Sequence, residues 1–204
     1  YEENIIWPGT SGIKLYGENK DTTIIDGMGE GTVIEFISAA VVDTEIKAVT
    51  IQNGYSSFYT SGLYIFAEQV TVEDVRFTGN NGGQTIEASM GIYWNEDGLD
   101  QKHIFNNVEI TNNTGMGIRM DVGDFEINHC LIAENSGYPI SFTTEAKRVE
   151  VDHSTILTDL EFVFFNETYG GVPYLDWTIS NSILHSSGFL IWLYAFQPGW
   201  PGLN

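Results

Sequence analysis

The residues best suited to chemistry in this sequence gather around one arginine. Arg119 stands in the stretch GIRMD, in a chain with only 8 lysines and arginines against 28 aspartates and glutamates. The nearest acidic candidates are Asp97, Asp100, Asp121 and Asp124. An arginine could take the proton next to a uronate carboxylate while aspartates hold Ca²⁺, which prefers oxygen ligands. The same guanidinium could instead bind a sugar without reacting, so the fold must decide how these residues are placed.

The composition indicates an ordered chain with a strongly acidic surface. Hydrophobic residues make up 42% of the 204 residues and charged residues 18%, whereas disordered chains are rich in charge. A formal net charge of −20 argues against nucleic acid and against anionic membranes as partners. Cys130 is the only cysteine, so no disulfide framework or cysteine-based zinc site is expected. No apolar run reaches the roughly 18 residues of a membrane span, and no membrane insertion is expected.

Short strand-like stretches recur along the whole chain. Six-residue stretches of similar pattern begin at 19, 46, 72, 105, 127, 151 and 179, at intervals of 22 to 33 residues. Each is followed by a turn and a second stretch: VIEF, GLYIF, GIYWN, GIRMD, PISFT, EFVFF and FLIWL. Both kinds of stretch alternate in polarity, and period-two alternation predicts strands with one buried face. Helical spacing of about 3.6 residues is not sustained, so no helix is expected between them.

The alternation also predicts which side chains form the core. The sixth position of the first stretches forms an apolar column: Ile24, Ile51, Phe77, Ile110, Ile132, Ile156 and Leu184. The fourth position forms a second column: Thr22, Val49, Val75, Val108, Cys130, Ser154 and Ser182. The second stretches supply inward pairs: Ile34 with Phe36, Leu63 with Ile65, Ile92 with Trp94, Ile118 with Met120, Ile140 with Phe142, Phe162 with Phe164, and Leu190 with Trp192.

Strands that recur without intervening helices can stack as a coil in which each rung pairs with the next. The stretches TTIIDGMGEGTVIEF, VTIQNG, FNNVEITNNTGMGI and INHCLIAENSG resemble the right-handed parallel β-helix, or pectin-lyase-like, superfamily. The resemblance implies an all-β solenoid of about seven coils that forms a single domain over residues 1–204. It does not imply one activity, because the superfamily contains lyases, glycoside hydrolases, esterases, epimerases, adhesins and phage spikes.

The third position of the first stretches is mostly polar and is expected at a bend between strands. Its residues are Asp21, Ala48, Asp74, Asn107, His129, His153 and Asn181. Stacked amides at such a bend can form a ladder of side-chain hydrogen bonds. His129 and His153 should be neighbours on adjacent rungs; two stacked histidines could hold a metal, but a third ligand is not evident, which favours polar ladder members. Cys130 is expected to be a small core residue.

The outward residues of the second stretches form a row on one sheet face: Glu35, Tyr64, Tyr93, Arg119, Ser141, Val163 and Ile191. Arg119 is then predicted to lie between Tyr93, one rung before it, and Ser141, one rung after it. The resemblance implies that a substrate groove would run along such a face, walled by loops from the longer coils. The candidate ligand-binding residues are Tyr64, Tyr93 and Arg119.

Three functions are compatible with this row. A Ca²⁺-dependent lyase of uronate polymers would use Arg119 as its base, but pectate lyases carry several basic residues along the groove, and only Lys102 and Arg76 are available here. Glycoside hydrolases of this superfamily that cleave polygalacturonate carry three aspartates with Gly-His-Gly and Arg-Ile-Lys motifs, which this sequence lacks. A non-catalytic module that binds a glycan, acts as an adhesin or belongs to an extracellular assembly is favoured. It requires no cofactor, and Ca²⁺ at the four aspartates is a separate hypothesis.

The ends of the sequence predict a fragment of a longer extracellular protein, secreted or held at the cell surface. The chain begins with YEENIIWPG and lacks an initiator methionine, which favours a piece from which a targeting segment has been removed. Residues 189–204 are unusually apolar, which predicts a segment folded over the last rung, or an interface with a neighbouring domain or a second copy. Asn112 and Asn166 open triplets that fit the glycosylation sequon.

Overall fold

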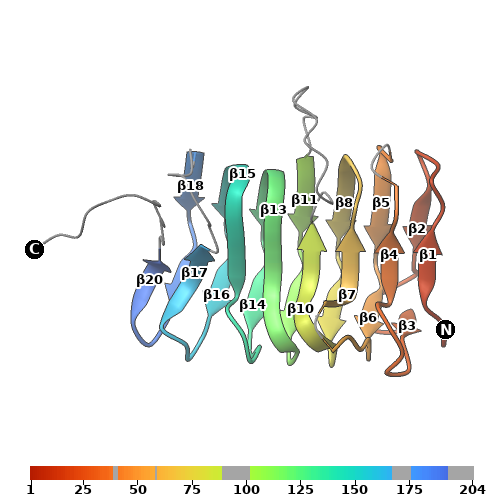
Figure 1. The fold of residues 1–204 in the computed structure, drawn as a ribbon, viewed down its shortest axis with the longest axis horizontal. Helices are drawn as coiled ribbons and strands as arrows, with labels where there is room; N and C mark the ends of the chain where they lie inside the picture. Colours follow the sequence, from red (N-terminus) through yellow and green to blue (C-terminus); the bar gives the residue numbers. More distant parts are fainter. Residues whose placement is uncertain (39–40, 58, 89–101, 167–175, 193–204) are drawn as a thin grey trace, which may run out of the picture.

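The chain folds as a parallel β-solenoid, as the repeats predict. The computed structural model describes residues 1–38, 41–57, 59–88, 102–166 and 176–192, and within them it contains twenty strands and no helix. None of these residues therefore belongs to a helix that could cross a membrane. Equivalent strands of successive rungs pair in parallel and lie side by side along the long axis (Figure 1).

The first face of the solenoid is a seven-stranded sheet. Its strands are β3 (Ile24–Asp26), β6 (Thr50–Gln52), β9 (Arg76–Thr78), β12 (Glu109–Thr111), β14 (Leu131–Ala133), β16 (Thr155–Leu157) and β19 (Ile183–His185). The solenoid makes about six turns, so the predicted number of seven coils is corrected by one. On this face the seven strands are joined by six passes of the chain through the other two faces.

The second and third faces are continuous because two long strands, β13 (Thr114–Asn128) and β15 (Ile140–Asp152), run through both. The second face holds their first halves and β1 (Ile5–Trp7), β4 (Ile34–Phe36), β7 (Thr60–Ile65), β10 (Asn81–Ala88), β17 (Phe162–Asn166) and β20 (Phe189–Trp192). The third face holds their second halves and β2 (Lys14–Tyr16), β5 (Thr44–Lys47), β8 (Gln69–Glu73), β11 (Lys102–Asn106) and β18 (Asp176–Ser180).

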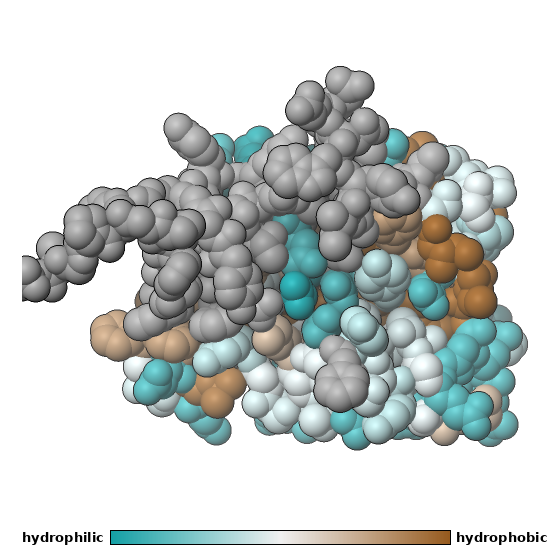
Figure 2. Space-filling view, viewed as in Figure 1, coloured by the Kyte–Doolittle hydropathy of each residue, from teal (hydrophilic) through white to brown (hydrophobic). Residues whose placement is uncertain are grey.

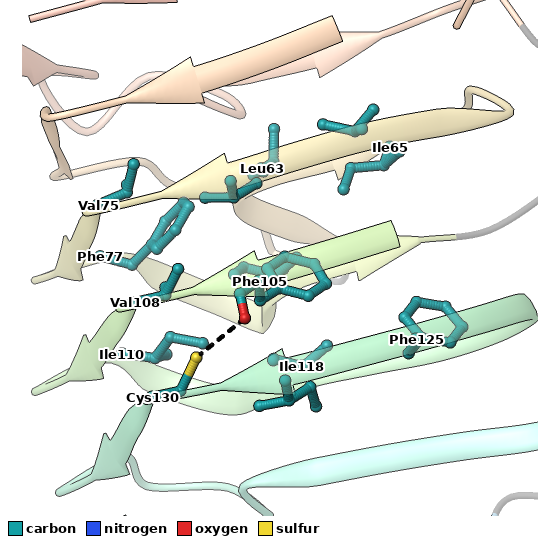
Figure 3. Packing of buried hydrophobic residues seen from close by; sticks show 14 of the residues in the cluster. Leu63, Ile65, Val75, Phe77, Phe105, Val108, Ile110, Ile118, Phe125 and Cys130 are labelled. Carbon is teal, nitrogen blue, oxygen red and sulfur yellow. Dashed lines mark hydrogen bonds between the residues drawn. The ribbon is translucent and has the colours of Figure 1, made fainter. Parts of the chain in front are cut away.

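Most of the predicted inward residues form the core, but in the last rung Ile191, and not Leu190 or Trp192, pairs with the inward Phe164, and Leu190 is 46% exposed. The column on the first face runs in register through Ile51, Phe77, Ile110, Ile132 and Ile156, and each of these side chains is completely buried. The neighbouring column of small residues packs beside it, with a hydrogen bond from the Cys130 thiol to the Phe105 carbonyl oxygen at 3.5 Å (Figure 3). Full burial of one such aliphatic or aromatic side chain contributes about 1.5–3 kcal/mol, which makes these columns the main source of stability.

The prediction for the first rung is wrong by one residue. Ile25, and not Ile24, pairs with Ile51 and is buried. The cause is a tight turn at Asn19, whose carbonyl oxygen accepts bonds from the backbone N–H groups of Thr22 and Thr23. This turn takes up one more residue than the corresponding bends do, and it shifts the alternation that follows.

The predicted bend at the third position is confirmed for six of its seven residues. Ala48, Asp74, Asn107, His129, His153 and Asn181 all have left-handed backbone conformations, with φ between 47° and 55°. This conformation strains side chains other than glycine, and asparagine, aspartate and histidine tolerate it better than most. The bends turn the chain from the third face into the first, so these six rungs change direction at the same place.

The continuous amide ladder lies at a different corner from the predicted one. Asn80, Asn113 and Asn135 stack where the first face turns into the second. The Nδ2 of Asn80 donates to Asn113 Oδ1 at 3.1 Å, and the Nδ2 of Asn113 donates to Asn135 Oδ1 at 2.9 Å. The same oxygens accept the backbone N–H groups of Asn80 and Asn113. The ladder therefore satisfies polar groups that the corner would otherwise bury without partners.

Replacing Ile132 by Asp is expected to unfold the protein, because an unpaired carboxylate would be buried in the middle of a stacked column. Leu131 provides the matched control, since it precedes Ile132 on the same strand and is 37% exposed. Leu131→Asp should leave a folded protein with a small change in melting temperature. Circular dichroism melting curves distinguish the two, and an unchanged midpoint for Ile132→Asp would contradict the register.

Replacing Asn113 by Ala should destabilise the fold by on the order of 2–4 kcal/mol, because backbone and side-chain groups on two neighbouring rungs lose their partners. Its neighbour Asn112 is exposed and has a left-handed backbone, so Asn112→Gly is a control that keeps the local conformation. Urea denaturation should show a large loss for Asn113→Ala and almost none for Asn112→Gly. Equal stability of the two variants would show that the ladder is dispensable.

Candidate functional site

A row of polar and aromatic side chains crosses the second face. Its residues lie in register on consecutive rungs: Glu35, Tyr64, Glu87, Arg119 and Ser141. Successive members are about 4.8 Å apart, the spacing of paired strands. The predicted placement of Ser141 one rung after Arg119 is confirmed. The row is referred to below as the second-face row.

The residue one rung before Arg119 is Glu87, and the predicted neighbour Tyr93 is wrong. Glu87 pairs with Tyr64 on one side and Arg119 on the other, so the stretch QTIEA, and not GIYWN, supplies this rung of the second face. Tyr93 itself lies outside the described residues, as do Ile92 and Trp94, which were predicted for the same strand. The row therefore contains a carboxylate that the repeat alignment missed.

Glu87 is held in one orientation by two short hydrogen bonds. Its Oε2 accepts bonds from Thr60 Oγ1 and Gln84 Nε2, both at 2.6 Å, and the residue is only 9% exposed. Both donors come from strands of the second face, β7 and β10. The carboxylate is thus fixed by its neighbours before any ligand arrives, which lowers the entropy cost of using it in recognition.

Arg119 is anchored by the aspartate two residues after it on the same strand. Its Nε donates to Asp121 Oδ1 at 2.9 Å, and the side chains are 30% and 17% exposed, respectively. Because the bond is made by Nε, it restricts the orientation of the guanidinium. A partly exposed pair of this kind contributes about 0–1 kcal/mol to stability, so its main effect is on orientation.

The last member of the row is a buried hydroxyl. Ser141 is completely buried, and its Oγ has no hydrogen-bond partner in the part of the chain that the structure describes. Beyond it the predicted row is wrong, because Phe165 and not Val163 pairs with Ser141, and Ile191 pairs with Phe164. Val163 is itself completely buried. The polar part of the second-face row therefore ends at Ser141.

The aspartates proposed as calcium ligands do not come together among the described residues. Asp121 accepts the bond from Arg119, whereas Asp124 pairs in register with Lys102 and Arg148 on the third face. Within the described residues there is no group of three His, Cys, Asp or Glu side chains that could hold a metal. Asp97 and Asp100 lie outside these residues, so the calcium hypothesis depends on them.

The other basic residues considered for a lyase face away from the second-face row. Lys102 lies on β11 of the third face and pairs with Glu126 at 2.6 Å. Arg76 lies on β9 of the first face, where it binds Glu109 at 2.7 Å and Asp21 at 2.9 Å. Neither residue can add a second positive charge beside Arg119.

His129 and His153 stack on adjacent rungs, as predicted. Their ring planes are 6° apart and their centroids 5.0 Å apart, and His153 Nδ1 lies 2.6 Å from Asp152 Oδ2. In stacked parallel rings the lone pairs run side by side and do not converge on one point. The arrangement therefore suits a surface ladder better than a metal site.

Cys130 is a core residue, as predicted. It is 3% exposed, and burial raises the pKa of its thiol to about 12. Since a nucleophilic cysteine requires a thiolate, this residue has no reactive role in the folded protein.

The comparisons with known proteins leave the fold as the only guide to relationship. No family model, no curated protein and no solved structure matches the chain.

His103 should make folding stability depend on pH. Burial lowers its pKa to about 4 from the usual 6.5, and its Nδ1 has no partner in the described part of the chain. Between these values the unfolded chain takes up a proton that the folded chain refuses. The free energy of unfolding should therefore be constant with respect to His103 above about pH 6.5, and it should fall by on the order of 3 kcal/mol as the pH drops to about 4.

Urea denaturation at several pH values would measure this effect. His103→Leu should flatten the stability curve in this window, whereas His185→Leu, at an exposed site, should keep the wild-type curve. Carboxylates with a lowered pKa, such as Glu109 and Asp152, begin to lose their contribution to stability only near the ordinary carboxyl pKa of about 4, at the lower end of the window. A wild-type curve retained in His103→Leu would assign the pH dependence to other groups.

Proposed function

We propose that this protein is a non-catalytic, extracellular β-solenoid module that binds a glycan through the second-face row. The observation that carries the proposal is the juxtaposition of Tyr64, Glu87 and Arg119 on consecutive rungs. An aromatic ring offers an apolar face to a sugar ring, while a carboxylate accepts from sugar hydroxyls and a guanidinium donates to them. Strand spacing repeats these groups along the rod, which suits a linear polymer lying across the rungs.

The charges near Arg119 favour binding over proton abstraction. Its described polar neighbours include Glu87 and Asp121, both acidic. A lyase needs positive charge or a metal beside the uronate carboxylate to stabilise the carbanion that forms. Two acidic neighbours oppose that charge, and with a net charge of −20 the whole surface repels polyuronates at low salt. These features favour a neutral or weakly charged glycan.

The open ends of the solenoid support a place in a larger assembly. In the last rung Ile183 is 62% and Phe189 is 67% exposed, and exposed apolar side chains on an edge favour contact with another surface. A neighbouring domain or a second copy would bury them. Residues 193–204, the rest of the apolar C-terminal stretch, lie outside the described residues. Figure 2 shows a second hydrophobic patch, near the N-terminal end of the rod.

Glycan-array binding of three variants tests the proposed function. Tyr64→Ala and Arg119→Ala should each weaken binding roughly tenfold, because each removes one of the three contact groups. Thr71→Ala is the control, since Thr71 lies on β8 of the third face. Arg119→Ala should melt within a few degrees of the wild type, because the pair with Asp121 contributes little to stability.

A depolymerisation assay on polygalacturonate, with and without Ca²⁺, tests whether the protein is instead a lyase or a glycoside hydrolase. No cleavage is expected from the wild type. Cleavage that disappears in Arg119→Ala, with an unchanged melting curve, would instead make the protein an enzyme. Binding that survives both Tyr64→Ala and Arg119→Ala would move the glycan site away from the second-face row.

A further inference from the structure

A surface cleft of about 450 Å³ opens at the corner between the first and second faces, away from the second-face row. Residues of three successive rungs line it, among them Met28, Asn53, Tyr55 and Asn81. Its residues lie where the chain enters the second face, and Asn81 is the first residue of β10, whereas Tyr64 stands near the end of β7. At a rung spacing of about 4.8 Å, the cleft extends for roughly 10 Å along the rod.

The cleft forms where the asparagine ladder stops. The ladder ends at Asn80, and the backbone N–H of Gly54 on the preceding rung donates to Asn80 Oδ1 at 3.0 Å. Gly54 has no side chain to extend the ladder, and a Cβ there would lie only 1.9 Å from the carbonyl oxygen of Ser61. The backbone at Gly54 therefore lies closer to the interior than a residue with a side chain would allow, and this leaves the space outside it open.

The cleft has apolar walls that solvent reaches. Tyr55 is 47% exposed and Met28 is 50% exposed, on neighbouring rungs. The backbone of Tyr55 is held on both sides: its N–H donates to the Gly31 carbonyl oxygen at 2.8 Å, and it forms a bridge with Asn81. A ring on such a fixed backbone offers a flat apolar surface at low entropy cost.

Two carboxamides supply polar groups at the cleft. Asn53 Nδ2 donates to Asp26 Oδ2 at 2.8 Å, which orients the amide, and a Cβ at Gly79 would lie 3.0 Å from Asn53 Oδ1. The side chain of Asn81 is exposed, so solvent or a ligand can reach its amide. An amide both donates and accepts, so the pair matches hydroxyl groups, which do the same. None of the residues that line the cleft is charged.

We propose that this corner cleft is a second carbohydrate site, which binds one or two units of a neutral glycan by stacking on Tyr55 and by hydrogen bonds to Asn53 and Asn81. The proposal takes its ligand class from the function proposed above but uses different residues. An open, uncharged cleft with one aromatic wall suits a polymer that enters and leaves along the rod. A charged ligand would find no ion pair there and would meet the acidic surface of the chain.

Titration calorimetry of the whole chain with neutral hexasaccharides tests this site; suitable probes are cellohexaose, maltohexaose, laminarihexaose and xylohexaose, with hexagalacturonate as the anionic comparison. Tyr55→Ala should weaken the binding of at least one neutral probe roughly tenfold, and Tyr55→Phe should retain most of it, because the ring remains. Asn81→Ala should weaken it less. Tyr16→Ala is the matched control, since Tyr16 is 57% exposed on the third face.

The variants also separate this proposal from the second-face site. Loss of binding in Tyr55→Ala, with binding retained in Arg119→Ala and Tyr16→Ala, supports the corner cleft. Loss in Arg119→Ala alone overturns it and leaves the second-face row as the glycan site. Equal loss in Tyr55→Ala and Arg119→Ala overturns the claim of a separate site. The absence of binding by every neutral probe at millimolar concentration overturns the cleft whatever the second-face row binds.

Discussion

The parallel hydrogen bonds between successive rungs are the constraint on which the rest of this structure depends. Each strand must return to the same register after one turn, so that Ile51, Phe77 and Ile110 stack above one another. Rungs of unequal length satisfy this by placing extra residues in the turns and in irregularities of the strand pairing, as between β10 and β7 and between β13 and β15. The faces thus stay regular enough to present ordered rows of side chains.

The corners meet the same constraint in two different ways. Between the third and first faces the backbone takes a left-handed conformation, and residues as different as Ala48 and His153 occupy it. Between the first and second faces the left-handed conformation recurs, at Asn53, Asn112 and Glu134, and the chain also buries amides that bond to their equivalents on neighbouring rungs. Where Gly54 replaces an asparagine, the interior stays closed and the surface opens. The ladder that stabilises the rod thus also sets the position of the corner cleft.

Alternation in the sequence was sufficient to predict the solenoid and most of its core, because buried columns demand an apolar residue at every second position. It failed where turns change the count, as at Ile24, and where one interval held two strand-like stretches. GIYWN alternates more strongly than QTIEA, which explains why Tyr93 was placed in the position of Glu87. The number of residues between a ladder asparagine and the next strand predicts the inward residues of the second face better than alternation does. Asn113 and Asn135 each precede the inward isoleucine of the next strand by five residues, and Asn80 precedes Ile86 by six. The hydrogen bonds to Glu87 come from residues at no repeated position, so the sequence pattern does not predict them.

Apart from ion pairs such as Arg76–Asp21 and Lys20–Glu109, the strands contact each other between neighbouring rungs, which makes this rod a nearly one-dimensional folding system. Its free energy is close to a sum of rung terms and rung–rung couplings, so a terminal rung is stabilised by one coupling and an internal rung by two. The last rung, where Phe189 is 67% exposed, should open many times more often than the rung of Ile132, which is fully buried. Amide hydrogen exchange would then be fastest in the terminal rungs and slowest in the middle of the rod, and the protein would unfold rung by rung from its ends.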